Sequence, residues 1–186
     1  MAKTESTMLP LGFVAPNFSL LDVVTQQRVS LNNTQKHMAT VIMFICNHCP
    51  YVKHVNPELA RLGLDYHGKN VRFIAISSND IESYPDDSPE KMKDVALTAG
   101  YTFPYLYDET QEVAKAYNAA CTPDFFVFDK DLKLAYRGQL DDSRPGNNIP
   151  LTGSSIRAAI DSLLAGSEVS QPQKPSIGCN IKWKNK

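Results

Sequence analysis

The sequence predicts an α/β fold: a central mixed β-sheet with helices on both faces and a β extension at the N-terminus. Two nearly continuous apolar runs, residues 41–45 and 71–77, are typical of strands that are buried on both faces of a sheet. Helical patterns alternate with the strand patterns, which favours parallel strands joined by helices. A hairpin pattern and a last helix follow, so antiparallel strands should complete the sheet.

The composition is that of an ordinary globular protein. The chain has 186 residues, 42% hydrophobic and 21% charged, with a net charge of −1. We expect a flexible tail over residues 1–10, one domain over 11–166 and a C-terminal tail over 167–186. Because no basic stripe, membrane-length apolar run or apolar signal segment is visible, we expect no nucleic-acid or membrane partner. We therefore expect a cytoplasmic protein, as a monomer or homodimer.

Seven strands are expected from apolar and β-branched runs that turn residues interrupt. They cover residues 18–21, 28–31, 41–45, 71–77, 105–108, 125–128 and 132–136. A polar turn separates the first two, and a turn around Lys130-Asp131 separates the last two. Each of these pairs is therefore expected to form a hairpin.

Four helices are expected between and after these strands, over residues 51–62, 88–99, 110–117 and 154–164. Pro57 should kink the first helix, and Gly63 should help to end it. The second should begin at Ser88 as N-cap and end before Gly100. The loop before it, residues 79–89, is rich in Asp, Ser and Pro, and we expect its acidic residues on a solvated surface: Glu82, Asp86 and Asp87.

The motif Cys46-Asn-His48-Cys49 follows a predicted buried strand and precedes a predicted helix. Free backbone N–H groups and the helix dipole favour a thiolate at such a junction. In a reducing compartment, closely spaced cysteines are more often catalytic or metal-binding than a structural bridge. We expect Cys46, at the edge of the helix, to be the more exposed thiol and the attacking one, and Cys49 to be the resolving thiol.

Three stretches together resemble the thioredoxin-like superfamily. The Cys-x-x-Cys looks like its redox motif, and Thr122-Pro123 before a strand looks like its cis-proline turn. The front half, with Gly12-Phe-Val-Ala-Pro-Asn-Phe-Ser-Leu and Val29-Ser-Leu, is similar to the alkyl hydroperoxide reductase/thiol-specific antioxidant (peroxiredoxin-like) branch. Residues 175–184 resemble the ending of a bacterial peroxiredoxin-like subgroup. The resemblance covers about residues 10–166 and implies a thioredoxin-like fold.

One departure from that branch bears on the chemistry. Peroxiredoxins have a Pro seven residues and a Thr or Ser three residues before the peroxidatic cysteine. Counted from Cys46, these positions hold Ala39 and Met43; counted from Cys49, they hold Ile42 and Cys46. The proline turn also lacks an adjacent Arg to polarise peroxide. We therefore predict a thiol–disulfide oxidoreductase, with a thiol peroxidase as the alternative.

The resemblance also implies roles for three further residues. His48 occupies the position found in strongly oxidising relatives with Cys-Pro-His-Cys, where an imidazole would stabilise the Cys46 thiolate. A cis bond between Thr122 and Pro123 would present the Thr122 backbone to an extended substrate. The expected substrates are disulfide-bearing proteins or small thiols with a thiol reductant, and no cofactor is expected.

Two other cysteines are candidate redox thiols. Cys121 precedes the proline turn, and we favour a buried apolar residue over a third redox thiol. Cys179 lies in the expected C-terminal tail, where it is either an additional resolving thiol or inert. The sequence leaves these two possibilities for Cys179 open.

A non-enzymatic alternative is a redox-sensing or metal-handling module. Cys46, His48 and Cys49, with His54 or His67, are residue types that bind zinc. A closed site needs four ligands in compatible loops, and no second Cys-x-x-Cys or His-x-x-x-His pair occurs in the sequence. We therefore expect no bound metal.

Overall fold

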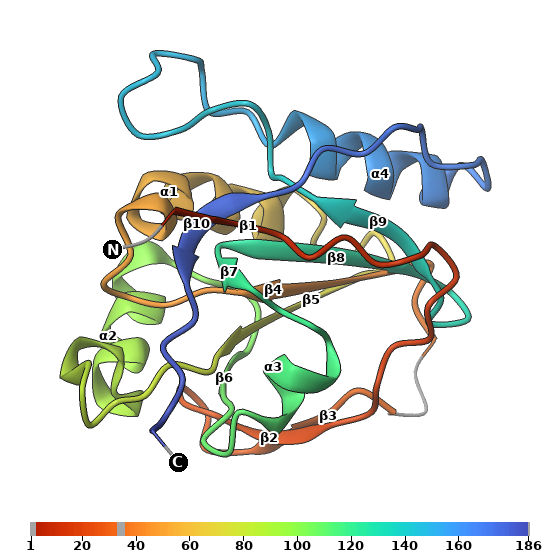
Figure 1. The fold of residues 1–186 in the computed structure, drawn as a ribbon. Helices are drawn as coiled ribbons and strands as arrows, with labels where there is room; N and C mark the ends of the chain where they lie inside the picture. Colours follow the sequence, from red (N-terminus) through yellow and green to blue (C-terminus); the bar gives the residue numbers. More distant parts are fainter. Residues whose placement is uncertain (1–2, 33–35, 186) are drawn as a thin grey trace.

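The computed structural model describes residues 3–32 and 36–185, and within them it contains two β-sheets (Figure 1). The strands are β1 (Lys3–Glu5), β2 (Ser19–Asp22), β3 (Arg28–Ser30), β4 (Ala39–Phe44), β5 (Val71–Ser77), β6 (Tyr105–Tyr107), β7 (Cys121–Thr122), β8 (Asp124–Asp129), β9 (Leu134–Gly138) and β10 (Ile177–Asn180). The helices are α1 (Pro50–Asp65), the 3₁₀ turn η1 (Pro85–Asp87), α2 (Pro89–Ala99), α3 (Glu112–Ala116) and α4 (Ser154–Leu164). None of the described helices is long and apolar enough to cross a membrane.

The larger sheet is mixed, as predicted. Its strand order is β3-β2-β6-β5-β4-β8-β9. Strands β4, β5 and β6 are parallel, whereas β8 pairs antiparallel with β4, and the β2–β3 and β8–β9 pairs are also antiparallel. All six residues of β4 are buried, which explains its nearly continuous apolar sequence.

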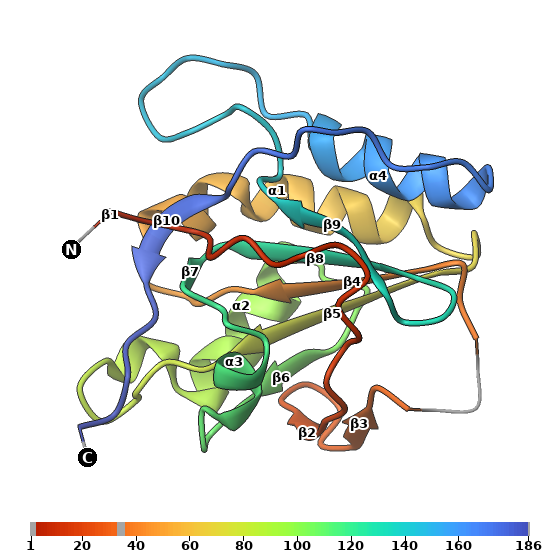
Figure 2. The same ribbon diagram turned by 45° about the vertical axis from the view of Figure 1, so that its right-hand side comes forward.

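Helices cover both faces of this sheet (Figures 1 and 2). Alternate residues of each strand face opposite ways, so each face of the sheet packs against its own helices. Val41 and Met43 belong to a core that also contains buried residues of α1, α2 and α4. Ile42 and Phe44 face the other way, into a core with Ala114 of α3. The two cores confirm the predicted arrangement of helices.

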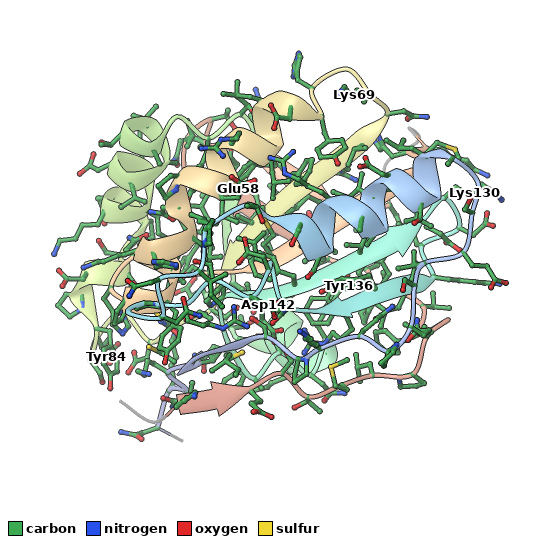
Figure 3. All side chains as sticks on the ribbon, turned by 90° about the horizontal axis from the view of Figure 1, so that it is seen from above. Glu58, Lys69, Tyr84, Lys130, Tyr136 and Asp142 are labelled. Atoms are coloured by element: carbon green, nitrogen blue, oxygen red, sulfur yellow. The ribbon has the colours of Figure 1, made fainter. Side chains whose placement is uncertain are left out.

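A buried carboxylate, that of Glu58, which Figure 3 labels, joins α1 to α4. Glu58 of α1 has no exposed side-chain surface, and Arg157 of α4 donates two hydrogen bonds to its Oε1, at 3.0 Å from Nε and 2.6 Å from Nη2. Helix α1 begins directly after Cys49. The pair therefore helps to fix the position of the helix that carries the cysteine motif at its start.

The prediction that Gly63 helps to end the first helix is wrong, since α1 continues to Asp65. A Cβ atom at Gly63 would lie 2.5 Å from Thr102 Oγ1 and 2.9 Å from the ring of Phe103. Glycine is therefore needed for close packing of α1 against the segment before β6. This requirement comes from the partner segment and is not visible in the local sequence.

The two ends of the chain differ from the sequence prediction, because both contribute strands. Strand β10 lies between β1 and β7 in the smaller sheet and pairs antiparallel with both (Figures 1 and 2). These three strands have only two to four residues each, too few for an apolar period to predict them. The smaller sheet thus brings residues near both termini to the start of β8.

A fully buried ion pair lies beside this junction. Arg137 Nη2 of β9 donates to Asp124 Oδ2 of β8 at 3.0 Å, and neither side chain is exposed. The Arg137 guanidinium also lies 3.7 Å from the centre of the Phe126 ring, within the range of a cation–π contact. Ser6, after β1, donates to Asp124 Oδ1 at 2.7 Å. The pair therefore ties the N-terminal segment to the large sheet.

Truncating one partner of this pair should destabilise the protein strongly. Asp124→Ala leaves the Arg137 guanidinium buried without its counter-charge, which costs about 3–5 kcal/mol in comparable pairs. Urea denaturation would measure the free energy of unfolding. Lys130→Ala is the control, because it removes a solvent-exposed pair with Asp131 in the turn between the same strands and should change stability little. An Asp124→Ala variant as stable as the unmodified protein would contradict this account.

Candidate active site

The structure brings the cysteine motif and the proline turn together. Cys46 and Cys49 lie between the end of β4 and the start of α1, with Cys49 as the N-cap residue of that helix. The Thr122–Pro123 peptide bond is cis, as predicted. Cys46 Sγ lies 3.3 Å from Thr122 Oγ1, and Cys49 Sγ lies 3.2 Å from the Thr122 carbonyl oxygen. Residues more than 70 positions apart therefore form one site.

Both cysteines of the motif are buried, so the expected difference in exposure between Cys46 and Cys49 is very small. Cys46 is 1% exposed and Cys49 is fully buried. Strand β10 pairs with β7 beside them and brings Cys179 Sγ to 2.9 Å from Cys49 Sγ. The four cysteines are free thiols in this structure. The C-terminal strand is therefore part of the wall of the site.

The electrostatics favour the thiolate on Cys49. Hydrogen bonds from the Cys46 thiol, the Cys179 thiol and the Val52 backbone lower the pKa of Cys49 to about 5, although burial opposes this. The pKa of Cys46 is raised well above its usual range, first by its hydrogen bond to Cys49 and then by burial and the Asp87 charge. Burial, with the hydrogen bond to Cys49, raises the pKa of Cys179 to about 12. Within this hydrogen-bonded pair, the pKa is lowered on Cys49 and raised on Cys46.

The His48 ring contacts the Asp87 carboxylate and the Tyr84 ring. Its Nδ1 lies 2.6 Å from Asp87 Oδ2, and its ring stacks on Tyr84 with the centroids 5.1 Å apart. The imidazole is therefore held by a carboxylate. The pKa of Cys46 is raised, with the Asp87 charge among the causes, and the predicted stabilisation of a Cys46 thiolate by His48 stays a prediction.

Asp87 is the site residue that the sequence analysis missed, and its assignment to a solvated surface is wrong. Its side chain is fully buried in the turn η1. Asp87 Oδ1 accepts the backbone N–H groups of Asn47 and His48 at 2.7 and 3.1 Å. Asp87 Oδ2 accepts Asn79 Nδ2 at 2.8 Å. The carboxylate therefore fixes the loop between the two cysteines, whereas the neighbouring Asp86 is exposed, with nothing in the local sequence to distinguish the two.

Cys121 lies behind the proline turn, outside the sulfur contacts just described. Its thiol donates to the Pro123 carbonyl oxygen at 3.6 Å, and burial raises its pKa. Such a thiol is a poor nucleophile. The structure therefore brings Cys46, Cys49 and Cys179 together and gives Cys121 a packing position beside them.

Comparison with known proteins agrees with this fold. Residues 11–137 match the model of the AhpC/TSA family. The chain belongs to the AhpC/TSA family. The matched region contains the cysteine motif and the proline turn, whereas Cys179 lies beyond it. A comparison with curated proteins gives no match.

Solved structures similar to this AhpC/TSA-family chain cover between 74% and 100% of it. A crystal structure of an uncharacterized conserved protein from Geobacillus kaustophilus is 64% identical, with a TM-score of 0.97, over 100% of this chain and 98% of that one. A hypothetical protein from Sinorhizobium meliloti is 44% identical, with a TM-score of 0.95 and coverage of 97% and 98%. The thioredoxin domain of a thiol-disulfide oxidoreductase from Bacteroides vulgatus shows the thioredoxin-like fold, at 18% identity, a TM-score of 0.59 and coverage of 74% and 91%.

One group of possible metal ligands occurs among the described residues. Cys46, His48 and Asp87 each offer an atom, and these atoms lie within 4.8 Å of one another. Both Asp87 oxygens already accept hydrogen bonds, one of them from the His48 ring. A metal ion would have to displace these bonds, and the group has three donors where a closed zinc site uses four. The hydrogen-bonded arrangement therefore fits the described geometry better than a closed metal site.

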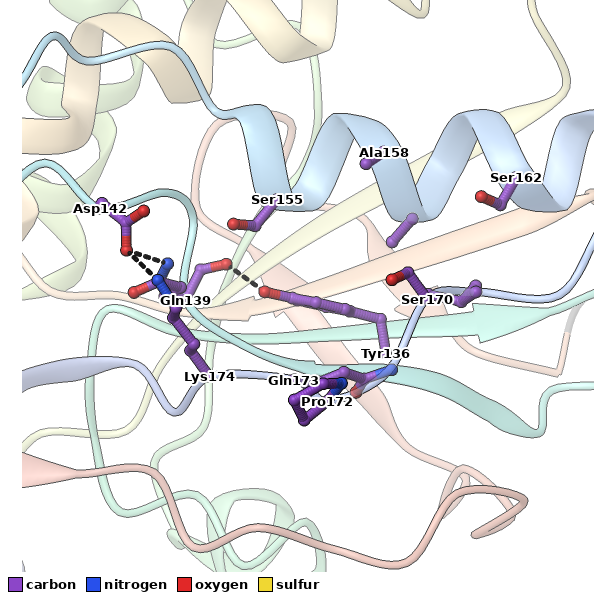
Figure 4. Close-up of a pocket in the computed structure, with 12 residues that line it drawn as sticks. Tyr136, Gln139, Asp142, Ser155, Ala158, Ser162, Ser170, Pro172, Gln173 and Lys174 are labelled. Carbon is purple, nitrogen blue, oxygen red and sulfur yellow. Dashed lines mark hydrogen bonds and ion pairs between the residues drawn. The ribbon is translucent and has the colours of Figure 1, made fainter.

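A separate pocket of about 220 Å³ lies between α4, β9 and the segment that leads to β10 (Figure 4). Tyr136 donates to the Gln139 carbonyl oxygen at 2.6 Å on its floor. Asp142 accepts Gln139 Nε2 and Lys174 Nζ, both at 2.9 Å. The Lys174–Asp142 contact fixes one wall of the pocket, the segment that leads to β10 and Cys179.

The acidity of Cys49 can be read from the ultraviolet absorbance of its thiolate as a function of pH. The native protein should show a titration near pH 5, because donors converge on this sulfur. Cys49→Ser should abolish that step, and Cys46→Ser should move it to higher pH by removing the first donor. Persistence of the step in Cys49→Ser, with its loss in Cys46→Ser, would place the thiolate on Cys46 instead.

Asp87→Asn should lower the pKa of Cys46, because it removes a negative charge beside that sulfur. The substitution also replaces one buried acceptor oxygen with an amide donor, and it should reduce the free energy of unfolding by about 1–3 kcal/mol. The titration is best followed in a Cys49→Ser background, which leaves Cys46 as the thiol nearest the carboxylate. Asp86→Asn is the matched control at an exposed position and should change neither quantity appreciably. An unchanged Cys46 pKa would remove the electrostatic role of Asp87.

Proposed function

We propose that this chain is a thiol–disulfide oxidoreductase that acts by dithiol/disulfide exchange at Cys46 and Cys49. The observation that carries the proposal is that Cys46 and Cys49 both contact Thr122 of the proline turn, and that hydrogen bonds lower the pKa of Cys49. An ionised sulfur next to a second thiol has the two groups that exchange requires: a nucleophile and a resolving thiol. Membership of the AhpC/TSA family supports a redox role for the site.

The exchange proceeds in two displacements. The Cys49 thiolate attacks one sulfur of a substrate disulfide, forming a mixed disulfide, and the other substrate sulfur leaves as a thiolate. Cys46 then loses its proton and attacks the Cys49 sulfur, which releases the second substrate thiolate. The protein gains a Cys46–Cys49 disulfide, and the substrate has taken up the two electrons. This order exchanges the roles that the sequence analysis gave to the two cysteines, because the thiolate is favoured on Cys49.

The substrate class follows from this chemistry. Disulfide-bearing proteins or small disulfides supply the oxidising sulfur, and a thiol reductant returns the Cys46–Cys49 pair to the dithiol. A cytoplasmic setting, where thiol reductants are abundant, is part of the proposal. The reaction needs no further cofactor.

A thiol peroxidase is the second candidate, and membership of the AhpC/TSA family favours it. The site lacks two features that the sequence analysis associated with that activity. Ala39 and Met43 occupy the positions of the expected Pro and Thr. Arg137 forms a buried pair with Asp124, so its guanidinium is already committed. Dithiol exchange therefore remains the better-supported reading.

Reduction of a small disulfide by a dithiol reductant tests the proposal. Cys49→Ser should lower the turnover by about a hundredfold or more, because it removes the attacking sulfur. Cys121→Ser is the matched control, a buried cysteine outside the sulfur contacts. Cys46→Ser/Cys179→Ser should accumulate a mixed disulfide at Cys49, detectable by mass spectrometry, because no thiol remains in contact with Cys49 to displace the substrate.

Two outcomes would contradict the proposal in different ways. A mixed disulfide that accumulates at Cys46 in the Cys49→Ser variant would restore the opposite order of attack. Rapid peroxide turnover with a thiol reductant, unaffected by Cys49→Ser, would replace dithiol exchange with a peroxidase mechanism at Cys46.

A further inference from the structure

Strand β10 occupies the backbone edge that an extended substrate would use. It pairs antiparallel with β7, so that Cys179 lies opposite Thr122 and Asn180 lies opposite Cys121 (Figures 1 and 2). Thr122 is the residue whose backbone was expected to pair with a substrate beside the redox cysteines. The chain therefore presents its own cysteine-bearing strand at that edge.

A glycine makes this close approach possible. A Cβ atom at Gly178 would lie 2.0 Å from the Thr122 carbonyl oxygen and 2.6 Å from its carbonyl carbon. Both are backbone atoms, so rotation of a side chain cannot relieve the overlap. The next residue is Cys179, whose sulfur lies 2.9 Å from Cys49 Sγ. The absence of a side chain at position 178 thus allows the sulfur of the following residue to reach Cys49.

Hydrogen bonds hold the segment on both sides of Cys179. Before it, Ser176 Oγ donates to the Pro123 carbonyl oxygen at 2.7 Å. After it, the Lys182 backbone N–H donates to Asn79 Oδ1 at 2.8 Å. The Asn79 amide also donates to Asp87, the carboxylate that fixes the cysteine loop. The position of Cys179 is therefore set by the same network that positions the motif.

We propose that Cys179 is a third redox thiol and that β10 is an internal substrate strand, which forms a Cys49–Cys179 disulfide in exchange with the Cys46–Cys49 disulfide. This inference rests on the proposed function, because dithiol exchange supplies the first disulfide. Cys49 is the sulfur common to both bonds. When it is bonded to Cys179, the strand is covalently locked over the site and Cys46 is free.

The exchange balances without an additional oxidant. The Cys179 thiol loses its proton and attacks Cys49 Sγ, the Cys46–Cys49 bond breaks, and Cys46 leaves as a thiolate that takes up a proton. One S–S bond is formed and one is broken, so there is no net change in oxidation state. The same attack on a mixed disulfide at Cys49 releases the substrate thiolate, so Cys179 also serves as a second resolving thiol.

The arrangement also defines the external substrates that fit. An extended peptide must displace β10 to pair with Thr122, and its cysteine must take the place of Cys179. A small residue before that cysteine, equivalent to Gly178, avoids contact with the Thr122 carbonyl group. We therefore expect a preference for extended disulfide-bearing segments with glycine at this position.

The Cys46→Ser variant isolates the attack of Cys179 on Cys49, because it removes the other resolving thiol. Treated with an aromatic disulfide that releases a coloured thiolate, this variant should release a first equivalent as Cys49 is modified and a second as Cys179 displaces the reagent. Peptide mapping without reduction should then recover a Cys49–Cys179 disulfide. The Cys46→Ser/Cys179→Ser variant should stop after the first equivalent, whereas the control Cys46→Ser/Cys121→Ser should release both.

The outcomes separate this inference from the proposed function. If the Cys46→Ser variant retains the reagent on Cys49 while the native protein reduces disulfides, Cys179 is not a redox thiol and dithiol exchange stands. If Cys49 forms no mixed disulfide in any variant and the native protein shows no exchange, both proposals fail.

Gly178→Ala provides a second test that keeps all four cysteines. The added Cβ should push β10 from Thr122, so alkylation of Cys49 in the reduced protein should accelerate by roughly tenfold or more. Formation of the Cys49–Cys179 disulfide in the Gly178→Ala/Cys46→Ser variant should slow correspondingly. Unchanged rates in both measurements would show that the close approach of β10 does not control the site.

Discussion

The buried carboxylate of Asp87 is the constraint on which the site depends. A charge without exposed surface is costly unless donors surround it, and Asp87 takes its donors from the cysteine loop, from the His48 ring and from Asn79. Asn79 in turn accepts the Lys182 backbone N–H. Satisfying one carboxylate therefore brings together the end of β4, the loop after β5 and the C-terminal segment, and it sets where Cys179 lies.

The same charge adds to the difference in pKa between the two motif cysteines, after their mutual hydrogen bond and burial. A thiolate on Cys46 would face the Asp87 carboxylate, whereas Cys49 sits at the N-terminus of α1, where backbone N–H groups point toward it. With Cys46 and Cys179 both donating, the negative charge is best accommodated on Cys49. The sulfur that bears the charge is also the one that contacts both neighbouring thiols. The lowered pKa and the contacts with neighbouring thiols therefore both belong to Cys49 Sγ.

Local patterns predict the larger sheet and its helices well, because an apolar run or an amphipathic period is a property of neighbouring residues. Strand β5 and helix α4 have the predicted bounds of 71–77 and 154–164, and the cis-proline turn lies where the resemblance implied. The remainder depends on partners that are distant in sequence. Cys49 and Cys179 are 130 positions apart, β1 and β10 are too short to show a period, and nothing local distinguishes Asp87 from Asp86. The role of Gly63 likewise comes from the segment packed against it.

A tethered strand at the substrate edge has a consequence for affinity. Because β10 is part of the chain, it competes at a high effective concentration with any external segment that pairs with Thr122. The apparent affinity for such a segment equals the intrinsic affinity multiplied by the fraction of molecules in which the strand is displaced. A Cys49–Cys179 disulfide would bring that fraction close to zero, and its reduction would restore the competition. On the proposed chemistry, substrate access is therefore coupled to the supply of reductant, through the same sulfur that performs the exchange.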